Sequence, residues 1–212
     1  TSQFDPFLLL DDFRNNNPID YQKGFPWHPH RGIETITYIL KGSVEHKDSL
    51  GNSGELSDGD LQWMTAGSGI LHQEMPKGNN VGQMHGFQLW ANLPSSLKMT
   101  SPNYQDVKSS EIRVVKDDDG TIIKIVIGNY KGYVGVINGI ASNPQYFDIY
   151  VPPNKIKKIP IPTYDNCFAY IFEGSGQFDY SSKPQGVKIE KSFNKEDFTI
   201  KDLSGNKTLI TF

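Results

Sequence analysis

The feature that most constrains the fold of this chain is a succession of short apolar runs, each broken by glycine or proline. The 20 glycines and 13 prolines are spread along the sequence, and isoleucine, valine, threonine, tyrosine and phenylalanine dominate the runs between them. Many short strands with frequent turn signals are typical of β-sandwiches and β-barrels, and no apolar pattern of helical period is sustained. We therefore predict an all-β chain, in which Ser95–Met99 forms one helical turn and little more. The predicted strands are Glu34–Leu40, Asp60–Met64, Gly86–Leu93, Ile122–Ile127, Phe147–Val151, Cys167–Phe172, Asp197–Ile200 and Thr208–Phe212.

Composition supports a globular protein and argues against several other classes. Hydrophobic residues make up 36% of the chain and aromatic residues 12%, which is ample for a core. The mean hydropathy of −0.49 and the lack of a long apolar run argue against a transmembrane helix. The opening residues, TSQFDPFLLLDDF, lack the basic and long apolar segments of a signal peptide. They also lack an initiator methionine, so we expect the native N-terminus to be missing.

Charge and cysteine content bear on partners and location. The net charge is −3 and the three arginines form no basic cluster, so direct nucleic-acid binding is disfavoured, while a protein partner stays open. Cys167 is the single cysteine, which rules out an internal disulfide and is typical of a reducing compartment. We therefore expect a cytoplasmic protein with no membrane partner.

The histidines are confined to the first half of the sequence. All five lie between positions 28 and 85. Residues i and i+2 of a strand point to the same face, so His28 and His30 form one candidate ligand pair, and His72 and Glu74 form another. On neighbouring strands the two pairs would converge on one centre. Imidazole and carboxylate ligands suit Fe, Mn, Ni, Co, Cu or Zn, and the lack of thiolate argues against a structural zinc site.

Three other residues near these pairs receive different interpretations. Glu34 follows the His-Pro-His pair by four residues and competes with Glu74 for the fourth ligand position. His46 lies in the polar segment SVEHKDSLG and is predicted to be exposed. His85 opens a predicted strand, and we expect it to have a structural or supporting role rather than to bind the metal.

Several of these motifs resemble those of known families. The segment HPHRGIETITYILKG resembles the first motif of cupins, in which HxH, a glutamate and a glycine share one β-barrel. The strings FDPFLLLDDF, FPWHPHRGIETITYILKG, GDLQWMTAGSGILHQEMP and HGFQLWANLP are similar to those of the pirin family in particular. Together these strings span Phe4 to about Pro94, whereas the second half resembles the family mainly in layout.

The resemblance implies a bicupin, with two antiparallel β-barrels and a metal site in the N-terminal barrel alone. The implied ligands are His28, His30, His72 and Glu74, and the implied ion is usually iron, taken here as Fe2+. This settles the competition for the fourth position against Glu34. Family members have further strands before the FDPF segment and beyond the end of this chain, so we expect both domains to be trimmed.

An internal similarity is in keeping with two domains, which we predict at residues 1–115 and 116–212. Tyr38–Ser43 (YILKGS) resembles Tyr170–Ser175 (YIFEGS), although two unrelated strand–turn segments can share such a match by chance. Asp117–Gly120 is predicted to be a linker or a hairpin tip.

Some pirins resemble quercetin 2,3-dioxygenases, which implies oxygenase chemistry on a flavonol-like chelating substrate. In this hypothesis Glu74 accepts the proton of the substrate hydroxyl as a general base. Asp11 is predicted to be an acidic residue beside the site, and Asp12 to be exposed. The residues predicted to wall the pocket, each of which could equally belong to the core or rim of the barrel, are Phe25, Trp27 and Met64.

Two other functions compete with the oxygenase hypothesis. Some pirins act as iron-dependent, non-enzymatic regulators that bind a transcription factor or a metabolic enzyme. The scarcity of arginine weakens the version in which this protein acts as a DNA cofactor and leaves the enzyme-partner version unaffected. The third hypothesis is a bicupin whose site is vestigial and binds no metal.

Overall fold

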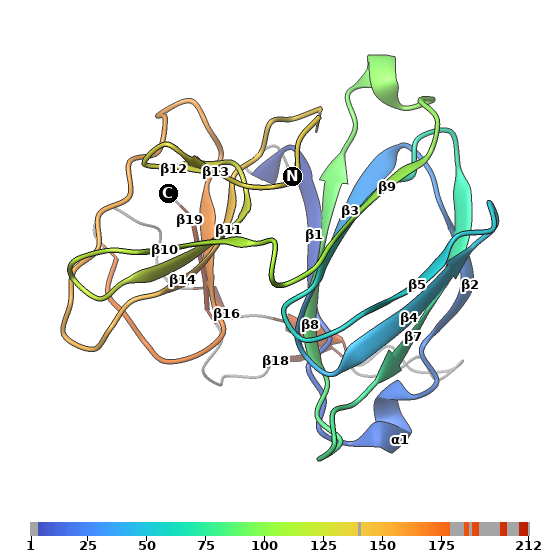
Figure 1. The fold of residues 1–212 in the computed structure, drawn as a ribbon, viewed down its shortest axis with the longest axis horizontal. Helices are drawn as coiled ribbons and strands as arrows, with labels where there is room; N and C mark the ends of the chain where they lie inside the picture. The colour runs from blue at the N-terminus through green and yellow to red at the C-terminus, as the bar shows by residue number, and fades with distance from the viewer. Residues whose placement is uncertain are drawn as a thin grey trace. The chain divides into compact units, whose positions relative to one another are not determined.

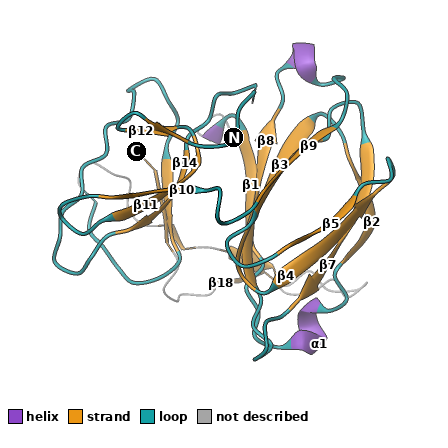
Figure 2. Cartoon of the chain, in the orientation of Figure 1, coloured by secondary structure: helices purple, strands orange, loops and turns teal. Residues whose placement is uncertain are grey.

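The architecture is nearly all β, with only short helical turns such as α1 (Pro18–Tyr21) and the 3₁₀ turn η2 (Ser95–Leu97) (Figure 2). A computed structural model describes residues 4–139, 141–178, 185–186, 188–190, 200–202 and 208–211. No helix among the described residues is long and apolar enough to cross a membrane. The chain divides into two compact units, one of Asp5–Lys158 and one of Thr1–Phe4 with Ile159–Phe212.

One layer of the larger unit is a five-stranded antiparallel sheet in the order β1-β8-β3-β6-β9 (Figure 1). Its strands are β1 (Phe7–Asp12), β3 (Ile33–Lys41), β6 (Leu61–Thr65), β8 (His85–Asn92) and β9 (Asn103–Val107). The central strand β3 is almost wholly buried and pairs with β8 on one side and β6 on the other. Its isoleucine, threonine and tyrosine residues suit a strand that is covered on both faces.

The facing layer of the larger unit is a four-stranded antiparallel sheet in the order β2-β7-β4-β5 (Figure 1). Its strands are β2 (Phe25–His30), β4 (Ser43–Asp48), β5 (Ser53–Leu56) and β7 (Ile70–Lys77). Burial alternates along β4 and β7, so every second side chain points into the space between the two sheets. Apolar clusters fill parts of this space and leave a polar region between them; their buried members are Ile39, Val44, Leu56 and Met84 in one and Met64, Ala66 and Ile70 in the other.

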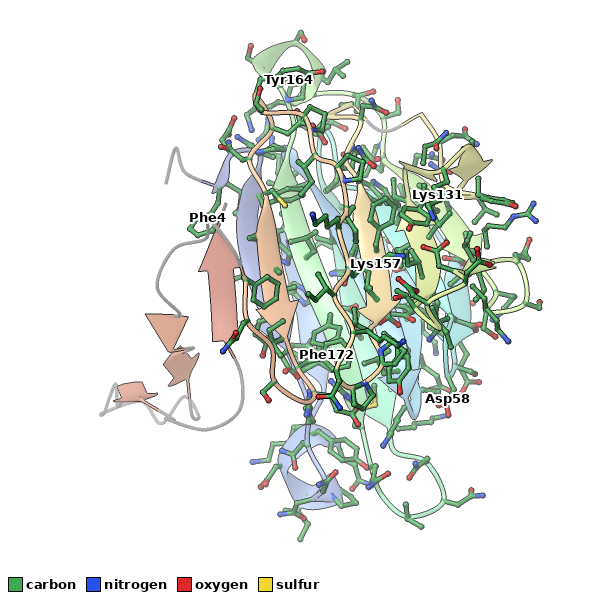
Figure 3. The ribbon with its side chains drawn as sticks, turned by 90° about the vertical axis from the view of Figure 1, so that its left-hand side faces the viewer. Phe4, Asp58, Lys131, Lys157, Tyr164 and Phe172 are labelled. Atoms are coloured by element: carbon green, nitrogen blue, oxygen red, sulfur yellow. The ribbon has the colours of Figure 1, made fainter. Side chains whose placement is uncertain are left out.

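A second group of strands continues the larger unit. Its members are β10 (Arg113–Lys116), β11 (Ile122–Ile127) and β14 (Tyr146–Tyr150) in one sheet, and the pair β12 (Asn129–Tyr130) and β13 (Tyr133–Val134). The predicted turn Asp117–Gly120 is the tip of the β10–β11 hairpin rather than a linker. Lys131 and Lys157, both labelled in Figure 3, donate to the Asp117 carboxylate at this tip. The predicted domain boundary between residues 115 and 116 falls within the hairpin and stays a prediction.

A buried hydroxyl links this second group to the five-stranded sheet. Tyr38 on β3 donates its Oη to Asp148 Oδ2 on β14 at 2.9 Å. Lys124 Nζ on β11 lies 3.3 Å from the same tyrosine oxygen and 3.2 Å from the Asp148 carboxylate. The three side chains therefore form one polar cluster between the two groups of strands.

The smaller unit is also built from strands where it is described. Its strands are β15 (Phe168–Ile171), β16 (Gln185–Gly186), β17 (Lys188–Glu190), β18 (Ile200–Asp202) and β19 (Thr208–Thr211). The rings of Phe4 and Phe168 meet edge to face, with centroids 6.0 Å apart. The two glycines of the predicted internal repeat both have a positive φ, 85° at Gly42 and 77° at Gly174. Glycine is favoured at such positive φ values, so both positions suit a tight turn after a strand.

The predicted strands are confirmed where the structure describes them. Their bounds agree within one residue at either end, and Ile122–Ile127 agrees at both ends. The predicted helical turn Ser95–Met99 is present as η2. The predicted strand Asp197–Ile200 lies outside the described residues except for Ile200, which opens β18.

Candidate metal centre

Three histidine side chains meet between the two sheets of the larger unit. His28 and His30 belong to β2 and point the same way because they are two residues apart. Strand β2 pairs with β7 in a register that places His28 opposite His72. One ring nitrogen of each residue lies within 4.8 Å of the other two. Local alternation and one strand pairing are therefore enough to assemble this histidine group of His28, His30 and His72.

The ring nitrogens of the histidine group face one another. His28 Nε2 lies 2.9 Å from His72 Nε2 and 3.1 Å from His30 Nε2. His28 Nδ1 donates to the carbonyl of Pro26 at 2.8 Å, so in the neutral ring Nε2 carries the lone pair. Two imidazole nitrogens that bind one ion at about 2.1 Å lie roughly 3 Å apart when their bonds meet at a right angle. The two distances from His28 Nε2 therefore fit an ion that His28 shares with His72 and with His30.

Burial keeps two of the rings in the form that binds metal ions. It is the main reason that the pKa of His30 is lowered to about 4 and that of His72 to about 3, and the charge of His28 acts in the same direction. Both rings are consequently neutral at pH 7, and neither must lose a proton before it coordinates an ion.

Glu74 lies beside the histidine group on the same strand as His72. Its Oε2 is 3.9 Å from His72 Nε2, and the residue is buried. Burial raises the pKa of the Glu74 carboxyl above its usual value, although hydrogen bonds from Gln88 and Thr37 act in the opposite direction. A buried carboxylate in this place could supply a further metal ligand or accept a proton.

The facing sheet supplies partners for both parts of the site. Gln88 Nε2 donates to the two Glu74 oxygens at 3.1 Å each, and it also lies 3.1 Å from Thr37 Oγ1. Trp90 Nε1 donates to Gln88 Oε1 at 2.8 Å. The Trp90 ring meets the His30 ring nearly at a right angle, with centroids 4.9 Å apart. The five-stranded sheet thus contacts the site at two points, the His30 ring and the Glu74 carboxylate.

Gln88, Trp90 and Thr37 were not predicted to belong to the site. A signal was present in HGFQLW, where Gln88 stands between apolar residues and shares a face with Trp90. A polar side chain on a buried strand must find a partner, and here the partner is Glu74 on the opposite sheet. The sequence shows that Gln88 needs a hydrogen-bond partner but does not show that the partner is Glu74.

A small pocket lies next to Glu74. Its lining consists of Asp11, Phe13, Phe25, Val44, Glu74 and Gln88. Asp11 and Phe25, two of the residues predicted to contact a substrate, belong to this lining. Trp27 is 53% exposed and Met64 is fully buried in an apolar cluster, and neither belongs to it. The substrate roles of these four residues stay predictions.

Glu34 and His85 lie apart from the histidine group. Glu34 is buried on β3, where it accepts a hydrogen bond from Thr65 Oγ1 at 2.8 Å. His85 Nε2 accepts a hydrogen bond from Arg14 Nε at 3.1 Å, and its structural or supporting role stays a prediction.

Two predictions about exposure are wrong. His46 is only 5% exposed, because the alternation of β4 turns it between the sheets, where its Nε2 lies 3.0 Å from Gln62 Nε2 and its ring stacks on Tyr104. The Asp12 side chain is only 8% exposed and pairs with Arg14 at 3.5 Å. In both cases a polar side chain was predicted to face solvent, whereas the folded chain satisfies it internally.

Comparisons with known proteins agree on one family. A family model described as Pirin matches residues 1–91. A pirin-like protein of Caulobacter vibrioides is 45% identical over 172 residues, which are 81% of this chain and 62% of that protein. A Thermoplasma acidophilum protein named "Putative quercetin 2,3-dioxygenase Ta0133" is 41% identical over 180 residues, which are 77% of this chain and 69% of that protein. The chain thus spans less than two thirds of the first of these relatives.

A solved structure supports the fold over the whole chain. Quercetin 2,3-dioxygenase from Acinetobacter baumannii matches with a TM-score of 0.64 and 30% sequence identity, and the match covers 99% of this chain and 68% of that one. The expected all-β cupin fold is therefore confirmed.

Proposed function

The chain belongs to the pirin family, and from that premise we propose that it is an iron-dependent oxygenase of the quercetin 2,3-dioxygenase type. Its substrate would be a flavonol-like chelating molecule, cleaved with O2. The observation that carries the proposal is the histidine group, whose facing nitrogens are 2.9 and 3.1 Å apart. The names of the Thermoplasma acidophilum protein and of the Acinetobacter baumannii structure support the same reaction class. The proposed location is the cytoplasm, which the single cysteine Cys167 favours.

The proposed metal ligands are His28, His30, His72 and Glu74, and the proposed ion is Fe2+. The support is the chemistry of the donors, since neutral imidazoles and a carboxylate suit borderline divalent ions. The same donors also suit Mn, Ni, Co, Cu and Zn, so the metal taken up by the protein must be measured.

The protein's own residues would orient the substrate and take its proton, while a bound iron ion would supply Lewis acidity and a path for electrons to O2. Glu74 is the proposed general base, because burial raises the pKa of its carboxyl above the usual value. Phe13 and Phe25 supply the aromatic side chains of the adjacent pocket's lining. Asp11 and Gln88 place polar groups in the same lining, where substrate hydroxyl groups could bind.

Carbon monoxide release from a flavonol tests the proposal. Protein purified without chelator is loaded anaerobically with Fe2+ and mixed with quercetin and O2, and CO and flavonol absorbance are followed. We expect turnover by the wild type and only buffer background for His28→Ala/His72→Ala, which removes two proposed ligands. His85→Gln is the matched control, because this buried histidine is bonded to Arg14 and lies outside the histidine group.

The outcomes separate the competing functions. Equal CO release by the wild type and the double variant would contradict the proposal. Iron uptake without turnover on a panel of flavonols would favour the regulatory alternative, which a pulldown comparing the Fe2+, Fe3+ and apo forms would pursue. Failure of the wild type to take up iron would favour a vestigial site.

A further inference from the structure

Gln88 and Trp90 reach the proposed metal site from β8 of the facing sheet. The two side chains lie on the same face of this strand because they are two residues apart. Trp90 touches the ring of His30, and Gln88 donates to both oxygens of Glu74. One hydrogen bond, from Trp90 Nε1 to Gln88 Oε1 at 2.8 Å, joins the two contacts.

The indole fixes which way round the Gln88 amide lies. An indole N–H can only donate, so the amide oxygen must face Trp90. The amide nitrogen is then turned toward Glu74, where it lies 3.1 Å from each carboxylate oxygen. The reversed amide would place its oxygen against the carboxylate and leave the indole N–H facing an NH2 group. Both contacts favour the observed orientation, so the carboxylate meets a donor that is already in place.

We propose that Gln88 is a positioning residue of the metal centre, with Trp90 acting through it. The Gln88 amide sets the direction in which the Glu74 carboxylate faces the histidine group. Residues that orient a metal ligand in this way commonly change metal affinity when they are replaced, although they do not touch the ion. The inference rests on the proposed function, because it takes Glu74 as a metal ligand.

Metal affinity tests this role without any enzyme assay. The Fe2+ affinity of the full chain is measured anaerobically by competition with a chromophoric chelator, and Co2+ absorption spectra report the ligand set. Gln88→Met removes the amide at similar side-chain length and is expected to weaken affinity by about 10- to 100-fold. Trp90→Phe keeps a ring beside His30 but removes the indole N–H, and we expect a loss of about 10-fold, at the lower end of that range.

A matched indole provides the control. Trp63 belongs to the same five-stranded sheet, but it pairs with Ile36 on β3 and so lies on the face opposite to Thr37. Trp63→Phe makes the same chemical change away from the site and should leave Fe2+ affinity and the Co2+ spectrum unchanged. Thermal unfolding of each apo variant shows whether it is folded. If Gln88→Met does not fold, the conservative Trp90→Phe variant still tests the inference.

A double variant separates positioning from general packing. If the indole acts through the amide, Trp90→Phe/Gln88→Met should bind Fe2+ no more weakly than Gln88→Met. If the wild type binds iron, either of two results would overturn the inference. One is that the losses of Fe2+ affinity add in the double variant, and the other is that both single variants keep the wild-type affinity. Failure of the wild type to bind Fe2+ would overturn the proposed function and this inference together.

Discussion

At the scale of single residues, surroundings decide what each buried histidine does. His72 and His46 both lie between the two sheets, on neighbouring strands. The Nε2 atom of His72 faces another histidine, whereas that of His46 lies 3.0 Å from the amide nitrogen of Gln62. The histidine group is therefore suited to a cation, while His46 is a hydrogen-bonded part of the core.

The confinement of His46 predicts the effect of adding one methyl group. A Cβ atom at Gly54, the cross-strand neighbour on β5, would lie 2.6 Å from His46 Nε2. Because Gln62 and the Tyr104 ring hold the imidazole, Gly54→Ala should lower the free energy of unfolding by about 1–3 kcal/mol. Urea denaturation of the apo protein measures this change. Ser53→Ala, at the exposed position before it, is the control, and equal stability of the two variants would contradict the argument.

The ligand pairs could be predicted from the sequence because their geometry is local. The two-residue period of a strand places His28 with His30, and His72 with Glu74, whatever the rest of the chain does. The partner of Gln88 could not be predicted in this way, because Glu74 reaches it from another sheet. Contacts of that kind depend on how the sheets face each other, which no local pattern encodes.

At the scale of secondary-structure elements, Asp60 ties two connections together. The residue is buried just before β6 and accepts hydrogen bonds from the backbone N–H groups of Ser57 and Ser109. Lys108 Nζ adds a third contact at 2.8 Å. The turn that leads into β6 is thereby joined to the segment that follows β9.

Acid should weaken this connection. Burial raises the pKa of Asp60, but the hydrogen bonds from Lys108, Ser57 and Ser109 outweigh it and hold the pKa below the usual 3.8. The Asp60 carboxyl therefore binds a proton more readily in the unfolded chain than in the folded one. The stability that ionised Asp60 contributes is complete above pH 3.8 and is lost as the pH falls through the pKa of the folded state. Asp60→Asn should cost about 1–3 kcal/mol at pH 7. Urea denaturation from pH 7 to pH 3 should show the gap to wild type closing at the acid end, and a constant gap would contradict the assignment.

At the scale of the whole molecule, the larger unit extends beyond the two facing sheets. The predicted boundary after residue 115 falls inside β10, which pairs with β11. The polar cluster of Tyr38, Lys124 and Asp148 joins β3 to β11 and β14. Strand positions could be predicted because apolar runs and turns are local features. The attachment of β10–β14 to the five-stranded sheet could not be predicted, because it depends on a hydroxyl and a carboxylate that are 110 residues apart.

Removing that hydroxyl tests the attachment. Tyr38 is buried, so Tyr38→Phe deletes its hydrogen bond to Asp148 and should lower the free energy of unfolding by about 1–2 kcal/mol. Tyr133→Phe makes the same change at a side chain that is 49% exposed, and it should have almost no effect. Equal effects of the two substitutions in thermal or urea unfolding would show that the Tyr38 hydroxyl does not stabilise the attachment.

The most direct test of the account is the metal content of the protein. The full chain, reconstituted anaerobically with Fe2+ and freed of loosely bound metal, is analysed for iron beside His72→Ala and His46→Gln. We predict about one iron per chain in the wild type, near-complete loss in His72→Ala and retention in His46→Gln, because His46 bonds to Gln62 instead of facing the histidine group. Equal iron content in the wild type and His72→Ala would contradict the assignment of the site.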